Sequence, residues 1–281
     1  MRRSRRPAFR YHGGKYRLAD WIIQKLPPHR VYVEPFGGAG SVLLAKPRSA
    51  MEVLNDADGE VVTFFKVLRE QPESLVRALS LTPYARAEVQ QAVRLDPDLP
   101  ELERARRFYV GQQMRVSPAL SGESKSLRFR REVLHASDNV ATAFYDLSPL
   151  LVVAERLRGV VIENDDWEAV VRRYDGPETC HYLDPPYLLA TRRRPDHGYR
   201  HELSAAGHAH LCAVARELTG SVLISGYEAA AYHAGLPGFF CLRRPGWSSG
   251  PGQKTEVLWV RSRTGRQLSL EAGWADPVRT A

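Results

Sequence analysis

The tetrapeptide Asp184-Pro185-Pro186-Tyr187 has the residue types that could hold the exocyclic amine of an aromatic base. The lone pair of such an amine is delocalised into the ring, so hydrogen-bond acceptors on both N–H groups are needed to localise it. The Asp184 carboxylate and the Pro185 carbonyl can accept these bonds, and consecutive prolines hold that carbonyl rigidly. Tyr187 offers an aromatic face for a stacked base. The alternative interpretation is a simple turn, because Asp-Pro and Pro-Pro are common turn formers.

A glycine-rich segment, Glu34-Pro35-Phe36-Gly37-Gly38-Ala39-Gly40, lies between a predicted strand and a predicted helix. Glycines there let the backbone turn tightly and approach a ligand closely. Asp56 ends the next predicted strand, where an acid can accept hydrogen bonds from ribose hydroxyls. Together the two segments predict a site for a nucleotide-like ligand at the carboxyl ends of the strands. A purely structural turn is the alternative.

Two further segments can contribute to the same site. Tyr11-His12-Gly13-Gly14-Lys15 precedes a predicted helix, whose free N–H groups could bind a carboxylate. Asn164-Asp165-Asp166-Trp167 follows a predicted strand, and one of its acids could reach the base of a nucleotide-like ligand. A flexible chain start and a helix N-cap are the respective alternatives.

Strand-like and helix-like patterns alternate in both end regions of the chain, which predicts a largely parallel, Rossmann-like α/β sheet. We expect strands at residues 31–36, 50–55, 160–163, 180–183 and 221–225, with a closing pair at 239–242 and 256–260. We expect helices at residues 16–26, 41–45, 61–69 and 203–218.

Residues 70–157 interrupt this alternation. They are rich in charge and show helical spacing at 83–93, 100–110 and 140–157, with a basic stretch rich in Ser and Gly at 117–131. We interpret this region as a helical insert that carries a basic hairpin or loop. The predicted domains are therefore 1–69 with 158–281, and 70–157.

The composition of the 281 residues, 43% hydrophobic and 26% charged, is typical of a globular protein and argues against disorder. The net charge of +8 favours a polyanionic partner. No apolar run is long enough to cross a membrane, and the basic start lacks the apolar stretch of a signal peptide, so we expect a cytoplasmic protein. The three cysteines, Cys180, Cys212 and Cys241, are far apart, so we expect reduced thiols and no metal site.

In their order along the chain, these four segments resemble those of the Dam-like family of DNA adenine methyltransferases. Residues 106–110 (Arg-Arg-Phe-Tyr-Val) and 225–227 (Ser-Gly-Tyr) resemble its phage-type members. The resemblance implies transfer of a methyl group from S-adenosylmethionine to the N6 amine of an adenine flipped out of double-stranded DNA. It makes Asp184, Pro185, Pro186 and Tyr187 the catalytic motif.

The resemblance also implies a cofactor site in which Tyr11, Lys15, Asp56 and Asp184 contact the cofactor or lie at its edge. Asp166 is favoured over Asp165 for the acidic position because an aromatic residue follows it. The complete expected set is Tyr11, Gly13, Gly14, Lys15, Glu34, Pro35, Phe36, Gly37, Gly38, Gly40, Asp56, Asp165, Asp166 and Asp184.

By resemblance, the insert reads the DNA target, although its basic stretch does not match the hairpin that reads GATC in the best-known members. Residues 188–201 follow the catalytic motif, and we hypothesise that they cover the flipped base and contact nearby phosphates. The expected DNA-binding residues are Arg115, Lys125, Arg128, Arg130, Arg192, Arg193 and Arg194.

Three alternatives stay open. The same chemistry could act on RNA adenine or on the N4 amine of DNA cytosine, and a non-catalytic DNA-binding regulator could retain the same motifs. The long insert between the cofactor loop and the catalytic motif favours DNA adenine. We expect a monomer, because base flipping needs only one subunit.

Overall fold

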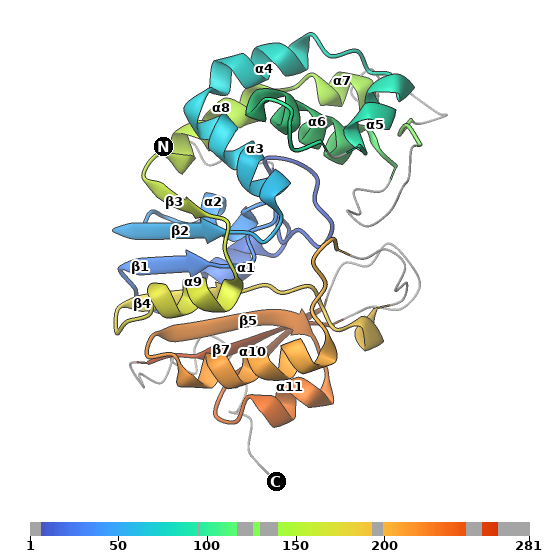
Figure 1. The fold of residues 1–281 in the computed structure, drawn as a ribbon. Coiled ribbons are helices and arrows are strands. Elements are labelled where there is room, and N and C mark those ends of the chain that lie inside the picture. The colour runs from blue at the N-terminus through green and yellow to red at the C-terminus, as the bar shows by residue number, and fades with distance from the viewer. Residues whose placement is uncertain are drawn as a thin grey trace.

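A computed structural model describes residues 7–94, 96–116, 126–129, 140–192, 199–245 and 255–263. Within these ranges seven strands form one sheet in the order β3-β2-β1-β4-β5-β7-β6 (Figure 1). The parallel strands are β1 (Val31–Glu34), β2 (Met51–Asn55), β3 (Val160–Glu163), β4 (Thr179–Leu183) and β5 (Ser221–Tyr227). The last two strands, β7 (Thr255–Arg261) and β6 (Phe240–Pro245), pair in antiparallel fashion. The predicted α/β fold is therefore confirmed.

Both faces of the sheet are covered, as the alternation of side chains along β4 and β5 requires. Cys180 and Leu223 belong to a core shared with helices α1 (Ala19–Ile23) and α2 (Ser41–Ala45). Leu183 and Ile224 belong to a second core shared with α10 (Ala205–Glu217) and α11 (Ala230–Gly235). Helices α9 (Trp167–Arg173), α10 and α11 lie in front of the sheet in Figure 1, and α2 lies behind it. Buried on both sides, the central strands read as continuous apolar runs.

Several predicted elements differ from those observed. The expected helix at 16–26 is reduced to α1, because turns flank it and Pro27 follows. The expected helix at 140–157 divides into α7 (Val140–Phe144) and α8 (Ser148–Leu157), since Pro149 occupies the first turn of a new helix. Helices α4 (Pro72–Ser80), α9 and α11 were not predicted.

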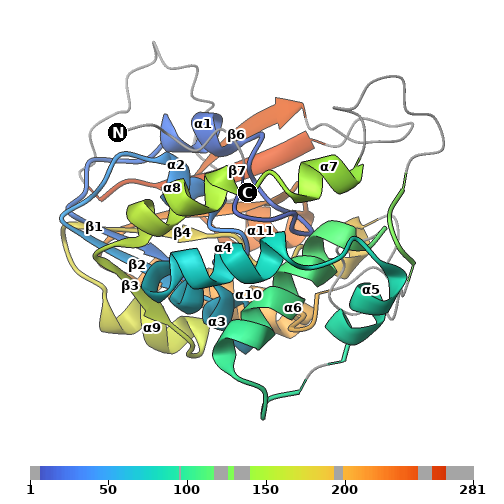
Figure 2. The same ribbon diagram turned by 90° about the horizontal axis from the view of Figure 1, so that it is seen from above.

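The helices of the insert region lie together beyond the β3 edge of the sheet (Figures 1 and 2). They pack on helix α3 (Gly59–Glu70). Helix α6 (Glu101–Met114) contacts both α3 and α5 (Arg86–Ala92). The rings of Phe9, Phe64 and Phe108 meet with centroids 5.0 Å apart in each of the pairs that include Phe9. The insert helices and one face of the sheet thus share a hydrophobic core, which holds the insert against the sheet.

A buried ionic cluster also joins the insert to the sheet. Glu52 of β2 accepts hydrogen bonds from Lys46 at 2.7 Å and from Arg156 of α8 at 2.6 and 2.8 Å. Arg156 additionally donates to the carbonyl of Leu43 in α2, at 2.6 Å. Burial alone would raise the pKa of Glu52, but the hydrogen bonds from Arg156 and Lys46 lower it overall. The cluster keeps a charged carboxylate inside the molecule by surrounding it with donors.

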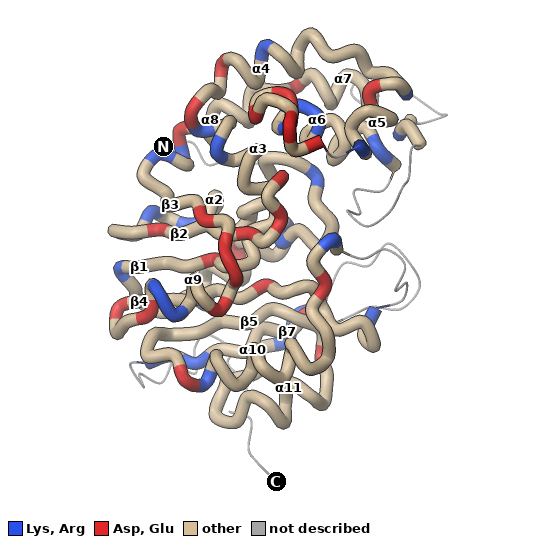
Figure 3. Tube along the Cα trace, viewed as in Figure 1, with Lys and Arg blue, Asp and Glu red and all other residues tan. Residues whose placement is uncertain are grey.

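Lys and Arg are interspersed with Asp and Glu over every layer of the described chain (Figure 3). The net positive charge therefore does not by itself identify a DNA-facing surface. All three cysteines are free and buried, as expected. No helix among the described residues is long and apolar enough to span a membrane.

We predict that Arg156→Ala lowers the free energy of unfolding by about 3–5 kcal/mol, because it leaves the Glu52 carboxylate buried with one donor fewer. Urea denaturation followed by circular dichroism measures this change. The matched control is Arg158→Ala, whose side chain is 73% exposed and pairs with Glu155 at the surface; it should change stability by no more than about 1 kcal/mol. Equal losses in the two variants would contradict the assignment.

Candidate active site

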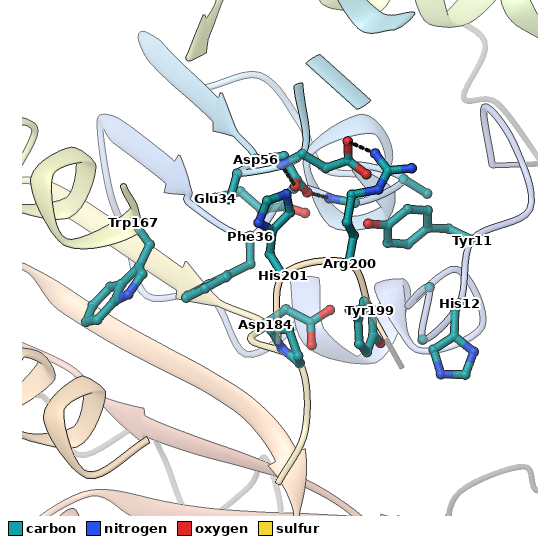
Figure 4. A pocket seen from close by; sticks show the side chains of 18 of the residues that line it. Tyr11, His12, Glu34, Phe36, Asp56, Trp167, Asp184, Tyr199, Arg200 and His201 are labelled. Carbon is teal, nitrogen blue, oxygen red and sulfur yellow. Dashed lines mark hydrogen bonds and ion pairs between the residues drawn. The ribbon is translucent and has the colours of Figure 1, made fainter. Parts of the chain in front are cut away.

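A pocket of about 290 Å³ opens at the carboxyl ends of the parallel strands. In Figure 4, Phe36 and Trp167 lie toward one end of it and Tyr11 and His12 toward the other. The chain crosses this edge after each parallel strand, so loops distant in sequence converge there. The pocket is lined by Tyr11, His12, Gly13, Gly14, Lys15, Glu34, Phe36, Gly37, Gly38, Ala39, Ser41, Asp56, Ala57, Asp58, Asp166, Trp167, Asp184, Pro186, Tyr199, Arg200, His201, Glu202 and Leu203.

The glycine-rich loop between β1 and α2 forms one wall of the pocket. Gly38 has a φ of 49°, in the left-handed region, and a Cβ there would lie 2.7 Å from the ring of Tyr11. The backbone N–H of Gly38 donates to the Asp56 carboxylate at 2.7 Å, and that of Asp58 donates to its other oxygen at 2.8 Å. Asp56 therefore holds the loop in place and still lines the pocket.

Burial shifts the pKa values of two acids at this loop. Burial raises the pKa of Asp56 to about 6, although the hydrogen bonds from Asp58 and Gly38 oppose the rise. Burial raises the pKa of Glu34 to about 8, against the hydrogen bond from Tyr32. Glu34 accepts from the Tyr32 hydroxyl at 2.9 Å and from the Leu43 N–H at 3.0 Å, which ties β1 to α2. At neutral pH, Asp56 is thus the more readily ionised of the two.

Asp184, directly after β4, lies beside a lysine from the start of the chain. Lys15 Nζ is 2.9 Å from Asp184 Oδ1 and donates to the Gly13 carbonyl at 2.7 Å. Burial raises the pKa of Asp184, and the charge of Lys15 opposes that rise. The same ammonium group lies 4.5 Å from the centroid of the Tyr187 ring. The catalytic motif and the N-terminal glycine motif therefore form one site.

A third wall comes from Tyr199–Leu203, whose first three residues end the stretch 188–201 that we expected to cover the flipped base. Arg200 pairs at 2.6 Å with Asp58, which lies two residues after Asp56. A Cβ at Gly13 would lie 1.9 Å from the Tyr199 hydroxyl, so Gly13 must lack a side chain for the two segments to meet. Glu202 and Leu203 were not predicted at the pocket.

The pair Asp165 and Asp166 separates in the structure. Asp166 lines the pocket, and its side chain also caps α9 by accepting from the Glu168 N–H at 2.9 Å. Asp165 instead pairs with Arg173 at 2.7 Å at an exposed position. Trp167, the aromatic that follows, stacks near Phe36 with ring centroids 5.8 Å apart. Asp166 can therefore cap α9 and also contact a ligand in the pocket.

Most of the expected cofactor residues meet at this pocket, while Pro35, Gly40 and Asp165 lie outside its described lining. Of the expected catalytic residues, Asp184 and Pro186 line it, whereas Pro185 and Tyr187 do not. The cofactor-binding and catalytic roles of all these residues stay predictions.

The expected DNA contacts are placed less uniformly. Arg115 is buried, and its Nε donates to the Gly111 carbonyl at 2.8 Å. Arg128 is half-buried, and its carbonyl accepts from the Tyr84 hydroxyl. Arg192 pairs with Glu202 through two hydrogen bonds, at 2.7 and 2.8 Å. Lys125, Arg130, Arg193 and Arg194 lie outside the described residues. Contact with DNA stays a prediction for all seven.

Comparison with known proteins shows which families this chain resembles. Residues 11–93 match the family of D12 class N6 adenine-specific DNA methyltransferases. A DNA adenine methylase of Salmonella typhi is 26% identical over 241 residues, which cover 81% of this chain and 83% of that protein. One of Vibrio cholerae is 34% identical over 74 residues, so the match spans about a quarter (26%) of each chain. A DNA N-6-adenine-methyltransferase of Escherichia phage P1 is 31% identical over 71 residues, 25% of this chain and 9% of that protein. These similarities confirm the predicted resemblance to DNA adenine methyltransferases.

Proposed function

We propose that this protein transfers a methyl group from S-adenosylmethionine to the N6 amine of an adenine flipped out of double-stranded DNA. The observation that carries the proposal is Asp184, whose side chain is only 16% exposed and lies 2.9 Å from Lys15 in the pocket that also presents Asp56. The names of the Salmonella and phage P1 relatives support adenine in DNA as the substrate.

The lining of the pocket suits a ligand that combines a nucleoside with an amino acid. Asp56, with a pKa of about 6, is ionised at neutral pH and can accept hydrogen bonds from two ribose hydroxyls. Phe36 and Trp167 offer apolar faces at one end, where Asp166 could accept from an exocyclic amine. Gly13 and Gly14 are exposed beside Lys15 at the other end, which leaves room for the carboxylate of the amino-acid part.

When bound, S-adenosylmethionine supplies an electrophilic methyl group on a sulfonium cation. Asp184 accepts a hydrogen bond from one N–H of the target amine, and the Pro185 carbonyl accepts from the other. These bonds draw the nitrogen lone pair out of the ring and direct it toward the methyl group. Lys15 orients the carboxylate and favours its charged form against the effect of burial. The methylated amine is acidic enough to lose its proton readily, so Asp184 need not be a strong base.

We predict that Asp184→Asn lowers the rate of methyl transfer in a single turnover by about 100-fold or more, because a carbonyl accepts more weakly than a carboxylate aligned with the amine. Cofactor affinity, measured by calorimetry, should be largely kept, since Asp56 and the glycine-rich loop are unchanged. Asp20→Asn, at an exposed acid of α1 outside the pocket lining, is the matched control and should transfer at the normal rate. Normal transfer by the Asp184 variant would rule out its proposed role.

We also predict that cofactor affinity falls as the pH is lowered through about 6, because Asp56 then becomes protonated and loses acceptor capacity. Asp56 is largely ionised between pH 7 and 8, so its titration should change cofactor affinity little in that range. Calorimetric titration of wild type and Asp56→Asn from about pH 5 to 8 tests this. The variant should bind more weakly and lose most of the pH dependence. A dependence equal to that of wild type would assign the titration to another group.

A further inference from the structure

The ring of Tyr187 is restrained from three directions. Its hydroxyl donates to Glu256 Oε2 at 2.9 Å, and Tyr227 packs against the ring at 80° with centroids 4.7 Å apart. The ammonium group of Lys15 lies 4.5 Å from the ring centroid. Only 8% of Tyr187 is exposed. These contacts fix both the position and the plane of the ring next to Asp184.

The reversal of the last strands explains why Glu256 can reach this tyrosine. Parallel strands end at the pocket edge, so β5 finishes there with Tyr227. Strand β7 runs antiparallel to β5 and begins at the same edge, with Glu256 opposite Tyr227 in register. Tyr187, which follows β4 on the other side of β5, lies over the end of that strand pair. A carboxylate from the far end of the sequence is thereby placed at the catalytic motif.

The hydroxyl of Tyr187 remains a donor under ordinary conditions. Burial, with the charges of Asp184 and Glu256, raises the pKa of Tyr187 well above its usual value. A buried donor without an acceptor is destabilising, so the ring orientation that satisfies the hydroxyl is strongly preferred. Glu256 sets that orientation.

We propose that Glu256 is a positioning residue for methyl transfer, which fixes Tyr187 in the plane on which the flipped adenine stacks. This assignment rests on the proposed function. In this role Glu256 acts through the tyrosine hydroxyl, so its carboxylate matters as a hydrogen-bond acceptor. An amide oxygen in the same place should therefore serve nearly as well.

The first test compares Glu256→Ala with Glu256→Gln in single-turnover methyl transfer to DNA. The alanine variant should lose roughly 10- to 100-fold in rate, because the stacking platform is no longer held in register with the amine. The glutamine variant keeps an acceptor and should remain within a few-fold of wild type. Cofactor affinity should be unchanged in both. A glutamine variant as slow as the alanine variant would show that charge matters and would overturn the assignment.

A spectroscopic test separates positioning from loss of folding. Duplex DNA carries 2-aminopurine at the adenine that sequencing of wild-type products identifies, so that fluorescence reports stacking of the flipped base. Glu256→Ala should give a brighter complex than wild type, because the base is less stacked on Tyr187, whereas Glu256→Gln should match wild type. Unchanged stacking in the alanine variant would contradict the proposal.

A double-mutant cycle tests whether the two residues act together. Tyr187→Phe keeps the ring and removes the donor, so adding Glu256→Ala to it should cause no further loss of rate. Losses that multiply would show that Glu256 acts independently of the tyrosine. Failure of the proposed function is distinguishable, because wild type would then transfer no methyl group to DNA adenine. An active wild type with an equally active Glu256→Ala variant would refute the positioning role alone.

Discussion

The contact between Lys15 and Asp184 is the interaction on which the rest of the site depends. Lys15 is buried and only 16% of the Asp184 side chain is exposed, and removing two charges from water is unfavourable unless their geometry and remaining hydrogen bonds compensate. The Gly13 carbonyl provides one such bond to Lys15, at 2.7 Å. Tyr199 can close over Gly13 only because that residue lacks a side chain. The start of the chain, the loop after β4 and the segment before α10 are thus locked together around one carboxylate.

The pocket differentiates its acids by environment. Glu34, whose pKa burial raises to about 8, is largely neutral at pH 7 and connects β1 with α2. Asp56, with a pKa of about 6, is largely ionised and faces the pocket. Asp184 keeps a cation beside it. Acids in one pocket therefore differ in protonation state, which is what the roles proposed for Asp56 and Asp184 require.

The sequence predicted the parts of this arrangement that depend on local pattern. The apolar runs located the parallel strands, and the Asp184-Pro185-Pro186-Tyr187 and glycine-rich segments fell at their carboxyl ends. Long-range pairings were not readable: nothing local shows that Arg200 meets Asp58 or that a reversed β7 brings Glu256 to Tyr187. Short helices such as α9 were missed because a few residues carry too little periodicity. The expected contacts of Arg115 also depend on packing, since its guanidinium lies buried against α6.

The most direct test of the account is incubation of the wild-type protein with labelled S-adenosylmethionine and unmethylated genomic DNA. Nucleoside mass analysis and sequencing then identify the modified base and its context. The account predicts label in N6-methyladenine within a short, defined DNA motif. Label in cytosine or only in RNA would contradict the proposed substrate, and bound cofactor without any label in DNA would contradict the proposed reaction and favour a non-catalytic regulator.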